Sequence, residues 1–172
     1  NYAIAKLQIL EEENLALKKL VNFQEKSAIK FITARVIGKN MEQTDQSIII
    51  DHGQTDGIQI GQAVIVGDGV LVGKIIKTDN NTAIVRLIND GQSKIAATVL
   101  NTERSMGVVE GGYGLSVKMN FIPRNETIKL GDIITTSGLD QNTPRGLIIG
   151  SVTAIENETY QPFQAAILSP FT

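Results

Sequence analysis

The amino-acid sequence predicts a mainly β protein in which one long helix is followed by two small β-barrels of the six-stranded type. Three observations support this prediction. The first 26 residues have helical periodicity and contain neither Gly nor Pro. The rest of the chain changes to a two-residue apolar period, and a glycine-centred segment occurs twice. We expect a coiled-coil helix over residues 1–28, a first barrel over 29–105 and a second barrel over 106–172.

The composition is that of a globular protein and argues against several functional classes. Of the 172 residues, 42% are hydrophobic and 20% are charged, which is enough to build a core. The net charge of −2, without any run of more than two Lys or Arg residues, argues against nucleic-acid binding. The chain has no Cys and one His, so we expect no disulfide, no metal site and no cofactor.

The start of the chain indicates a fragment of a longer protein. No apolar run approaches the roughly 18 residues that a membrane-spanning helix needs. Asn1 stands in place of a Met, and the helical pattern begins there without an evident capping residue. We therefore expect the natural N-terminus to lie upstream of Asn1.

The helical segment has the pattern of a coiled coil. Apolar residues recur at spacings of three and four, with one Asn in the series, and we assign them to heptad positions a and d. An Asn at an a position lowers stability but favours a parallel two-stranded register. The predicted seam consists of Leu7, Asn14 and Val21 at a and of Leu10 and Leu17 at d.

The charges beside this seam agree with a parallel homodimer. Lys6 and Glu13 stand at g positions, and Glu11 and Lys18 stand at the e positions of the following heptad. In a parallel pair Lys6 would face Glu11 and Glu13 would face Lys18, and both contacts are attractive. The alternative is a single amphipathic helix packed on its own barrel, because about three heptads are short for an independent coiled coil.

From Phe31 onward, alternating apolar residues and many β-branched side chains predict short strands. Turn residues such as Asn89-Asp90-Gly91 separate them, and no helical pattern lies between them. Small all-β barrels or sandwiches are therefore favoured over βαβ units. The expected strands are Phe31–Ile37, Ser47–Asp51, Ala63–Val66, Val70–Lys77, Thr82–Ile88, Ser93–Leu100, Met106–Glu110, Leu115–Phe121, Ile133–Thr136, Leu147–Ile155 and Gln164–Ser169.

An internal repeat indicates two related barrels. Ile58–Val64 (IQIGQAV) matches Ile128–Ile134 (IKLGDII), and Gly69–Ile75 (GVLVGKI) matches Gly146–Val152 (GLIIGSV). Each copy is interpreted as a loop, a glycine turn, a strand and a second strand with a glycine in its middle. Two copies predict two barrels in tandem, with a boundary near residue 105.

Four glycines of the repeat are expected to shape the barrels. Gly61 and Gly131 occupy the turn of each copy, and Gly73 and Gly150 occupy the middle of a strand. A glycine inside a strand lowers stability, so it usually marks a bulge, a barrel corner or a close approach of another backbone.

The same segments resemble the family of rod shape-determining MreC proteins. The resemblance covers nearly the whole chain. It rests on the helix, both glycine signatures and their order, because no single motif is decisive. Segments 50–53, 56–64, 69–75 and 85–90 resemble the first barrel of the family, segments 131–139 and 144–150 resemble the second, and segment 13–20 resembles its coiled coil.

This resemblance implies a non-enzymatic scaffold of the bacterial cell-elongation complex. It implies two barrels of chymotrypsin-like topology without a protease site, which bind and position the elongation-specific penicillin-binding transpeptidase and so maintain rod shape. Further implied partners are MreD, RodA and, from the cytoplasmic side, MreB. The implied location is periplasmic, or extracytoplasmic, in a single-span inner-membrane protein whose anchor lies outside this sequence.

Two other functional classes stay open at this point. A periplasmic adaptor of an efflux or secretion system also joins a coiled coil to small β-domains, but it needs a helical hairpin, and only one helical pattern is present. A serine protease would require His52, beside Asp51, to activate Ser137. An oxyanion-hole loop is usually rich in glycine, whereas Ser137 has only Gly138 after it, so we interpret His52 as a turn residue.

The partner-binding surface is not assigned by the sequence. The loops after Phe121 and around Tyr160–Phe163 are candidates, because they place aromatic residues in polar surroundings. The alternative is that these aromatic side chains cover one end of a barrel.

Overall fold

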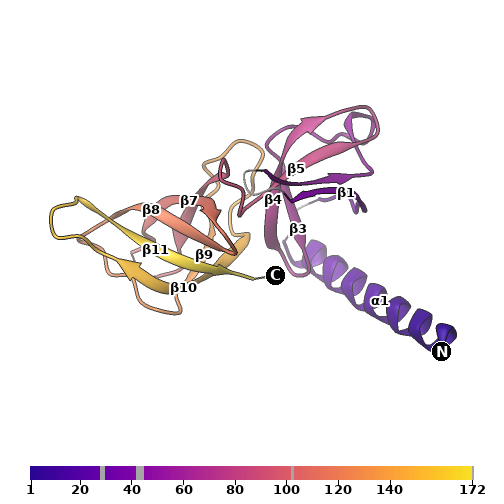
Figure 1. Ribbon diagram of the computed structural model, residues 1–172, viewed down its shortest axis with the longest axis horizontal. Helices are drawn as coiled ribbons and strands as arrows, with labels where there is room; N and C mark the ends of the chain where they lie inside the picture. Colours follow the sequence, from indigo (N-terminus) through magenta and orange to yellow (C-terminus); the bar gives the residue numbers. More distant parts are fainter. Residues whose placement is uncertain (28–29, 42–44, 102, 172) are drawn as a thin grey trace.

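A computed structural model describes residues 1–27, 30–41, 45–101 and 103–171, without the side chains of residues 20–27 and Met41. Helix α1 (Tyr2–Ser27) projects away from the β-strands (Figure 1). Asn1 caps this helix, since its Oδ1 accepts a hydrogen bond of 3.0 Å from the backbone N–H of Ala3. The expectation of an uncapped start is therefore wrong. In the described part of the chain, no helix has the length and apolar character that a membrane span requires.

The rest of the described chain is β-structure joined by turns and loops. Nearly every expected strand is found, and most of their ends agree to within two or three residues. The strands are β1 (Val36–Met41), β2 (Gln46–Ile50), β3 (Ala63–Val66), β4 (Val70–Thr78), β5 (Ala83–Leu87), β6 (Lys94–Val99), β7 (Met106–Tyr113), β8 (Ser116–Pro123), β9 (Ile133–Thr136), β10 (Ile148–Glu156) and β11 (Phe163–Pro170).

The first strand begins later than expected. The predicted strand was Phe31–Ile37, whereas β1 begins at Val36. Arg35 is held by Asp51 instead of by a partner strand. Its backbone N–H donates to Asp51 Oδ1 at 2.8 Å, and its carbonyl accepts from the backbone N–H of Asp51 at 3.1 Å.

Six strands form a closed barrel in the order β10-β11-β8-β7-β6-β9, and β9 pairs back with β10. We call these six strands the closed barrel. Strands β1, β2, β5 and β4 continue the sheet, with β3 paired to β4, and we call these five strands the N-terminal unit. Among the described strands only β6–β11 close into a ring, so the structure shows one six-stranded barrel with extra strands. Figure 1 shows the two groups side by side, with α1 leading away from the N-terminal unit.

Strand β6 bears on the predicted domain boundary. It pairs with β7 and with β9, both of which belong to the closed barrel. A boundary near residue 105 would separate β6 from both neighbours. The division into 29–105 and 106–172 stays a prediction, and the pairing of β6 favours a boundary before Lys94.

The two copies of the repeat have the same backbone hydrogen bonds. Gly61 N–H donates to the carbonyl of Ile75 at 2.8 Å, and Gly131 N–H donates to that of Val152 at 2.8 Å. Both glycines have a positive φ, of 92° and 87°, which side chains disfavour. The sequence repeat is therefore a repeat of structure as well.

The mid-strand glycines also occupy equivalent places. Gly73 pairs with Val64 across the β3–β4 ladder, and Gly150 pairs with Ile134 across β9–β10. A Cβ on Gly73 would meet the carbonyl oxygen of Arg86 at 2.3 Å, and one on Gly150 would meet that of Ser169 at 2.4 Å. Both are sites where a neighbouring backbone approaches too closely for a side chain.

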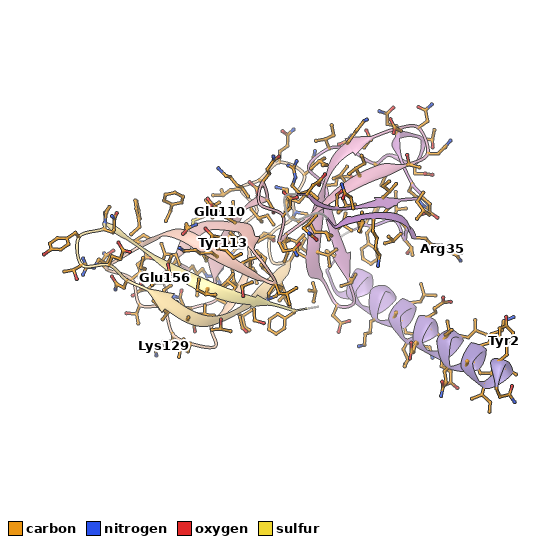
Figure 2. All side chains as sticks on the ribbon, in the orientation of Figure 1. Tyr2, Arg35, Glu110, Tyr113, Lys129 and Glu156 are labelled. Atoms are coloured by element: carbon orange, nitrogen blue, oxygen red, sulfur yellow. The ribbon has the colours of Figure 1, made fainter. Side chains whose placement is uncertain are left out.

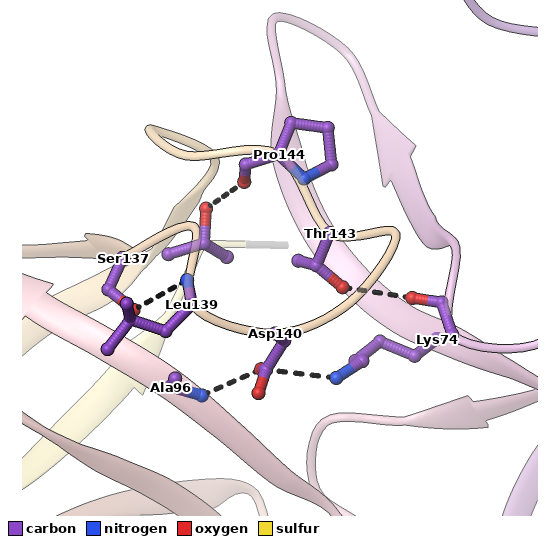
Figure 3. Close-up of polar contacts among 9 residues, drawn as sticks. Lys74, Ala96, Ser137, Leu139, Asp140, Thr143 and Pro144 are labelled. Atoms are coloured by element: carbon purple, nitrogen blue, oxygen red, sulfur yellow. Dashed lines mark hydrogen bonds and ion pairs between the residues drawn. The ribbon is translucent and has the colours of Figure 1, made fainter.

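A loop between β9 and β10 holds the two groups of strands together (Figure 3). The Asp140 carboxylate accepts from the backbone N–H of Ala96 in the closed barrel at 2.9 Å and contacts Lys74 Nζ in the N-terminal unit at 3.2 Å. Thr143 Oγ1 donates to the carbonyl of Gly61 at 2.9 Å. The apolar core also crosses this junction, because Leu71 of β4 is fully buried in the core of the closed barrel.

Candidate interaction surface

Two aromatic side chains stand together on the outside of the closed barrel. Phe121 of β8 and Phe163 of β11 pack edge to face, with ring centroids 5.8 Å apart and an interplanar angle of 82°. They nevertheless remain 55% and 46% exposed. Both rings are therefore partly presented to solvent. An exposed aromatic pair of this kind is a common feature of protein-binding surfaces.

The backbone at Phe121 has a strained, left-handed conformation, and its ring is exposed to solvent. Phe121 has φ = 63°, a conformation that is a genuine outlier for a bulky side chain and costs about 1–3 kcal/mol. Residues Asn120 and Phe121 together oppose Ala165 alone, which is a β-bulge between β8 and β11. A bulge re-aims the side chains beside it. Strain of this kind is retained most often at functional sites.

Further side chains on the outer surface of β8 and β11 continue the patch that begins with this aromatic pair. Lys118 lies opposite Ile167 in the ladder, and Ala165 lies two residues from Ile167 on the same side of β11. We call Lys118, Phe121, Phe163, Ala165 and Ile167 the β8–β11 face.

An ion pair spans this face from β8 to β10. Lys118 Nζ lies 2.8 Å from Glu156 Oε2 and 5.6 Å from the centre of the Tyr113 ring. The hydrogen bond to Glu156 is the main cause of the raised pKa of Lys118. Figure 2 shows Tyr113 and Glu156 on the closed barrel. The face therefore combines apolar contact area with an ion pair, in which Glu156 is the more exposed partner.

The predicted seam of α1 is not covered by the rest of the chain. Every residue from 1 to 19 is exposed, so the described helix side chains do not pack on a barrel. Leu7, Leu10 and Leu17 are each at least half exposed. The alternative of local packing is therefore not observed for these residues. The side chain of Val21 lies outside the described residues.

The remaining seam residues also point to solvent in one chain. Asn14 and the four charged residues Lys6, Glu11, Glu13 and Lys18 are exposed. Their predicted contacts join two chains, so the seam and its charge pairs stay predictions.

The residues considered for proteolysis lie in different parts of the structure. His52 Nδ1 contacts Asp51 Oδ1 at 2.8 Å in the N-terminal unit. Ser137 follows β9 in the closed barrel, where its Oγ accepts from the backbone N–H of Leu139 at 3.4 Å. The pKa of Asp51 is lowered mainly by the backbone N–H of Arg35 and next by His52. Asp51 is therefore a local structural acceptor that orders the start of the β-structure.

An exposed aromatic face on a barrel, together with an exposed helix that carries leucines at heptad spacing, is typical of proteins that bind other proteins. Residues 36–172 match the family model of the barrel core of the rod shape-determining protein MreC. The cell shape-determining protein MreC of Bacillus subtilis is 33% identical over 178 residues, which cover 96% of this chain and 61% of that protein. A solved structure of MreC has a TM-score of 0.79 at 27% identity, and the match covers 94% of this chain and 93% of that chain.

The chain therefore belongs to the MreC family, whose members are non-enzymatic cell-shape proteins. It spans 61% of the length of its Bacillus subtilis relative. A further structure, a complex between a penicillin-binding protein (PBP2) and MreC from Helicobacter pylori, has a TM-score of 0.66 at 15% identity. That match covers 81% of this chain and 86% of the other chain, and it shows a shared fold.

The aromatic residues could be identified from the sequence, but the packing of their rings against each other could not. Sequence reasoning named the loops after Phe121 and around Tyr160–Phe163, and the structure brings Phe121 and Phe163 together across neighbouring strands. Tyr160 lies in the connection between β10 and β11 and is almost fully exposed. Lys118 and Glu156 were missed, because their pairing depends on the order of strands in the barrel.

Proposed function

We propose that this chain is the extracytoplasmic body of a scaffold that maintains rod cell shape by binding and positioning the elongation-specific penicillin-binding transpeptidase. Membership of the MreC family supports this proposal. The Helicobacter pylori complex of PBP2 with MreC supports it further, since a protein of this fold binds a penicillin-binding protein there. The observation that carries the choice of surface is Phe121, whose exposed ring is held by a strained backbone.

The chemistry of the β8–β11 face fits a partner surface with apolar side chains and polar groups that can hydrogen-bond at its edge. Phe121 and Phe163 supply rigid apolar area, and aromatic anchors dominate the energy of many protein interfaces. Lys118 is held by its ion pair with Glu156 and lies beside the Tyr113 ring. A polar group of the partner beside this ion pair would improve specificity more than affinity.

A titration of the chain against the extracytoplasmic region of the transpeptidase tests this proposal. We expect saturable binding that persists at physiological salt. Phe121→Ala and Phe163→Ala should each weaken binding by about tenfold or more, as interface aromatic residues commonly do. Phe171→Ala is the matched control, because Phe171 is also exposed on the closed barrel but lies outside the face. Equal effects of all three substitutions would reject this surface.

We also propose that α1 forms a parallel homodimer through the seam of Leu7, Leu10, Asn14, Leu17 and Val21. The exposure of the described seam side chains supports this proposal, because leucines at heptad spacing are otherwise left in water. MreD and RodA are proposed as further partners, with MreB reached from the cytoplasmic side. A membrane anchor upstream of Asn1 would hold the protein at the inner membrane.

We infer that the N-terminal unit is an open counterpart of the closed barrel, and that both descend from one chymotrypsin-like pattern. The matched hydrogen bonds of Gly61 and Gly131 support this inference. In the closed barrel, β6 fills the place between β7 and β9. In the N-terminal unit the corresponding place lies between β1 and β3, and residues 30–35 are the segment that corresponds to β6. Ala34 packs against the core of that unit, as the inference requires.

A further inference from the structure

A cavity with a strongly positive lining lies where the N-terminal unit meets the closed barrel. Its volume is about 600 Å³. Four cationic side chains line it, Lys74 and Lys77 from β4, Arg86 from β5 and Lys94 from β6, and none of its described lining residues carries a carboxylate. We call these four residues the basic groove. Such a cluster stands out in a chain whose net charge is −2, and a concave site lined by one sign of charge concentrates ions of the opposite sign.

A β-bulge places both β4 lysines on the same side of the sheet. Lys74 pairs with Arg86, and Lys77 pairs with Ile84, two residues earlier on β5. Ile84 and Arg86 share one side of their strand. The register shift between Ile75 and Lys77 therefore turns Lys77 to the side of Lys74 and Arg86. With a regular ladder Lys77 would face the opposite side, so the bulge builds the groove.

The arrangement of these charges is unfavourable for the isolated fold. Lys74 and Arg86 stand directly opposite each other on neighbouring strands, and like charges in that position destabilise a sheet. Their only ion pairs in the described chain are Lys74 with Asp140 at 3.2 Å and Arg86 with Asp90 at 3.5 Å. Lys77 and Lys94 form no ion pair with any described residue. Two of the four charges thus have no ion pair in the described chain, and Lys94 has the oppositely charged Glu110 at its partner position in the β6–β7 ladder.

We propose that the basic groove binds phosphate groups of an anionic ligand. Arg86 is held in place for this role, because its Nη2 donates to Gln92 Oε1 at 3.2 Å while its Nε faces Asp90. A fixed guanidinium with neighbouring ammonium groups suits the oxygens of phosphate. Four cations, two of them in ion pairs, suit a group with more than one negative charge, such as a pyrophosphate. This site is separate from the β8–β11 face and does not rest on the proposed function.

A second cavity beside the basic groove has balanced charges, so the proposed phosphate site does not extend into it. That second cavity has a volume of about 480 Å³ and shares Arg86 with the basic groove. Its other charged lining residues are Lys39, Asp45 and Asp90, so its charges are balanced. The ligand phosphates therefore bind on the side of Lys74, Lys77 and Lys94.

Asp140 tunes this site from the loop between β9 and β10 (Figure 3). Its carboxylate forms an ion pair with the ammonium group of Lys74 and accepts a hydrogen bond from the backbone N–H of Ala96. A bound phosphate competes with this carboxylate for Lys74. Asp140→Asn keeps an oxygen that can accept from Ala96 and removes the negative charge, so it should raise phosphate affinity by roughly two- to fivefold, the range of an exposed charge pair.

The test uses the whole 172-residue chain and two probes. One probe is inorganic pyrophosphate, followed by calorimetry and by the shifts of backbone amide signals. The other is a sedimentation assay with vesicles of phosphatidylglycerol mixed with phosphatidylcholine. Lys77→Gln and Lys94→Gln should each lower affinity by roughly two- to fivefold. Lys129→Gln is the matched control, since Lys129 is exposed on the closed barrel away from the groove (Figure 2).

The outcomes separate the sources of phosphate and decide the proposal. Pyrophosphate binding that is weakened only by the groove substitutions supports the site with a soluble ligand. Vesicle binding with the same dependence, without pyrophosphate binding, supports it with a lipid headgroup. Binding of neither probe, or equal weakening by Lys129→Gln, would overturn it. A decrease in affinity with Asp140→Asn at unchanged stability in urea would also contradict it, because that change removes a competing negative charge while the junction stays intact.

Discussion

Gly150 in β10 allows a close approach of the backbones of β10 and β11. Replacing it with alanine tests whether this repeat glycine is needed for stability. In Gly150→Ala the new Cβ would lie 2.4 Å from the carbonyl oxygen of Ser169 and 3.1 Å from Cα of Pro170. Real Cβ contacts essentially never fall below 3.0 Å, so β11 would have to move by at least the difference of 0.6 Å. Both neighbouring atoms belong to the backbone, and no side-chain rotation can relieve the clash.

The cost of this substitution has two parts. Overpacking a well-packed site costs about 1–3 kcal/mol, and weakening a ladder hydrogen bond between β10 and β11 adds about 0.5–1.5 kcal/mol. We therefore expect Gly150→Ala to lower the free energy of unfolding by about 2–4 kcal/mol, a large share of the usual 5–15 kcal/mol. Urea unfolding followed by circular dichroism measures the change.

Two further glycines make this a matched experiment. Gly73→Ala should lose a similar amount, because its Cβ would meet the carbonyl oxygen of Arg86 at 2.3 Å. Gly91→Ala is the control, since the nearest atom to its Cβ is 3.9 Å away and its φ is not in the left-handed region. It should change stability by less than about 0.5 kcal/mol. If all three variants unfold at the same urea concentration, the close approach of the backbones does not shape the closed barrel or the N-terminal unit.

Three other substitutions test separate parts of the account. Phe121→Gly should be less destabilising than Phe163→Gly by about 1–2 kcal/mol in urea unfolding, because only Phe121 has a left-handed backbone; an equal loss would argue against strain at Phe121. Asn14→Leu should tighten the helix dimer and permit larger assemblies, as measured by sedimentation equilibrium. If both the parent chain and the variant are monomeric, the predicted seam is rejected. Asp51 has a lowered pKa, so its stabilisation is complete above its unfolded value near pH 4 and is lost as pH falls through the folded value. Asp51→Asn should therefore lower stability at neutral pH and flatten the acid limb of the stability curve, and an unchanged acid limb would contradict this assignment.

The strands are predictable from the sequence because each has one side in a core. The alternation over Val70–Lys77 predicts β4 almost to its last residue, and burial alternates along that strand in the structure. The first strand is the exception. Phe31 and Ile32 have strand composition, but the chain there is held by the contact of Arg35 with Asp51. A contact over such a sequence distance leaves no local signal.

The candidate sites are less predictable, because they depend on bulges and on strand order. Phe is a common strand residue, so nothing in the sequence marks the positive φ of Phe121. The direction of Lys77 depends on a register shift at Ile76, which changes the side on which every later residue lies. Lys94 joins the basic groove only because the fold brings the start of β6 in the closed barrel beside β4 and β5 of the N-terminal unit.

Amide hydrogen exchange of the chain with and without the extracytoplasmic region of the transpeptidase tests whether the β8–β11 face binds this partner. We expect slower exchange in β8 (Ser116–Pro123) and β11 (Phe163–Pro170) when the partner is bound. Exchange in β1 and β2 of the N-terminal unit should change little. Protection confined to the N-terminal unit or to α1, or unchanged exchange with both proteins folded at tens of micromolar, would contradict the claim that the β8–β11 face binds this partner.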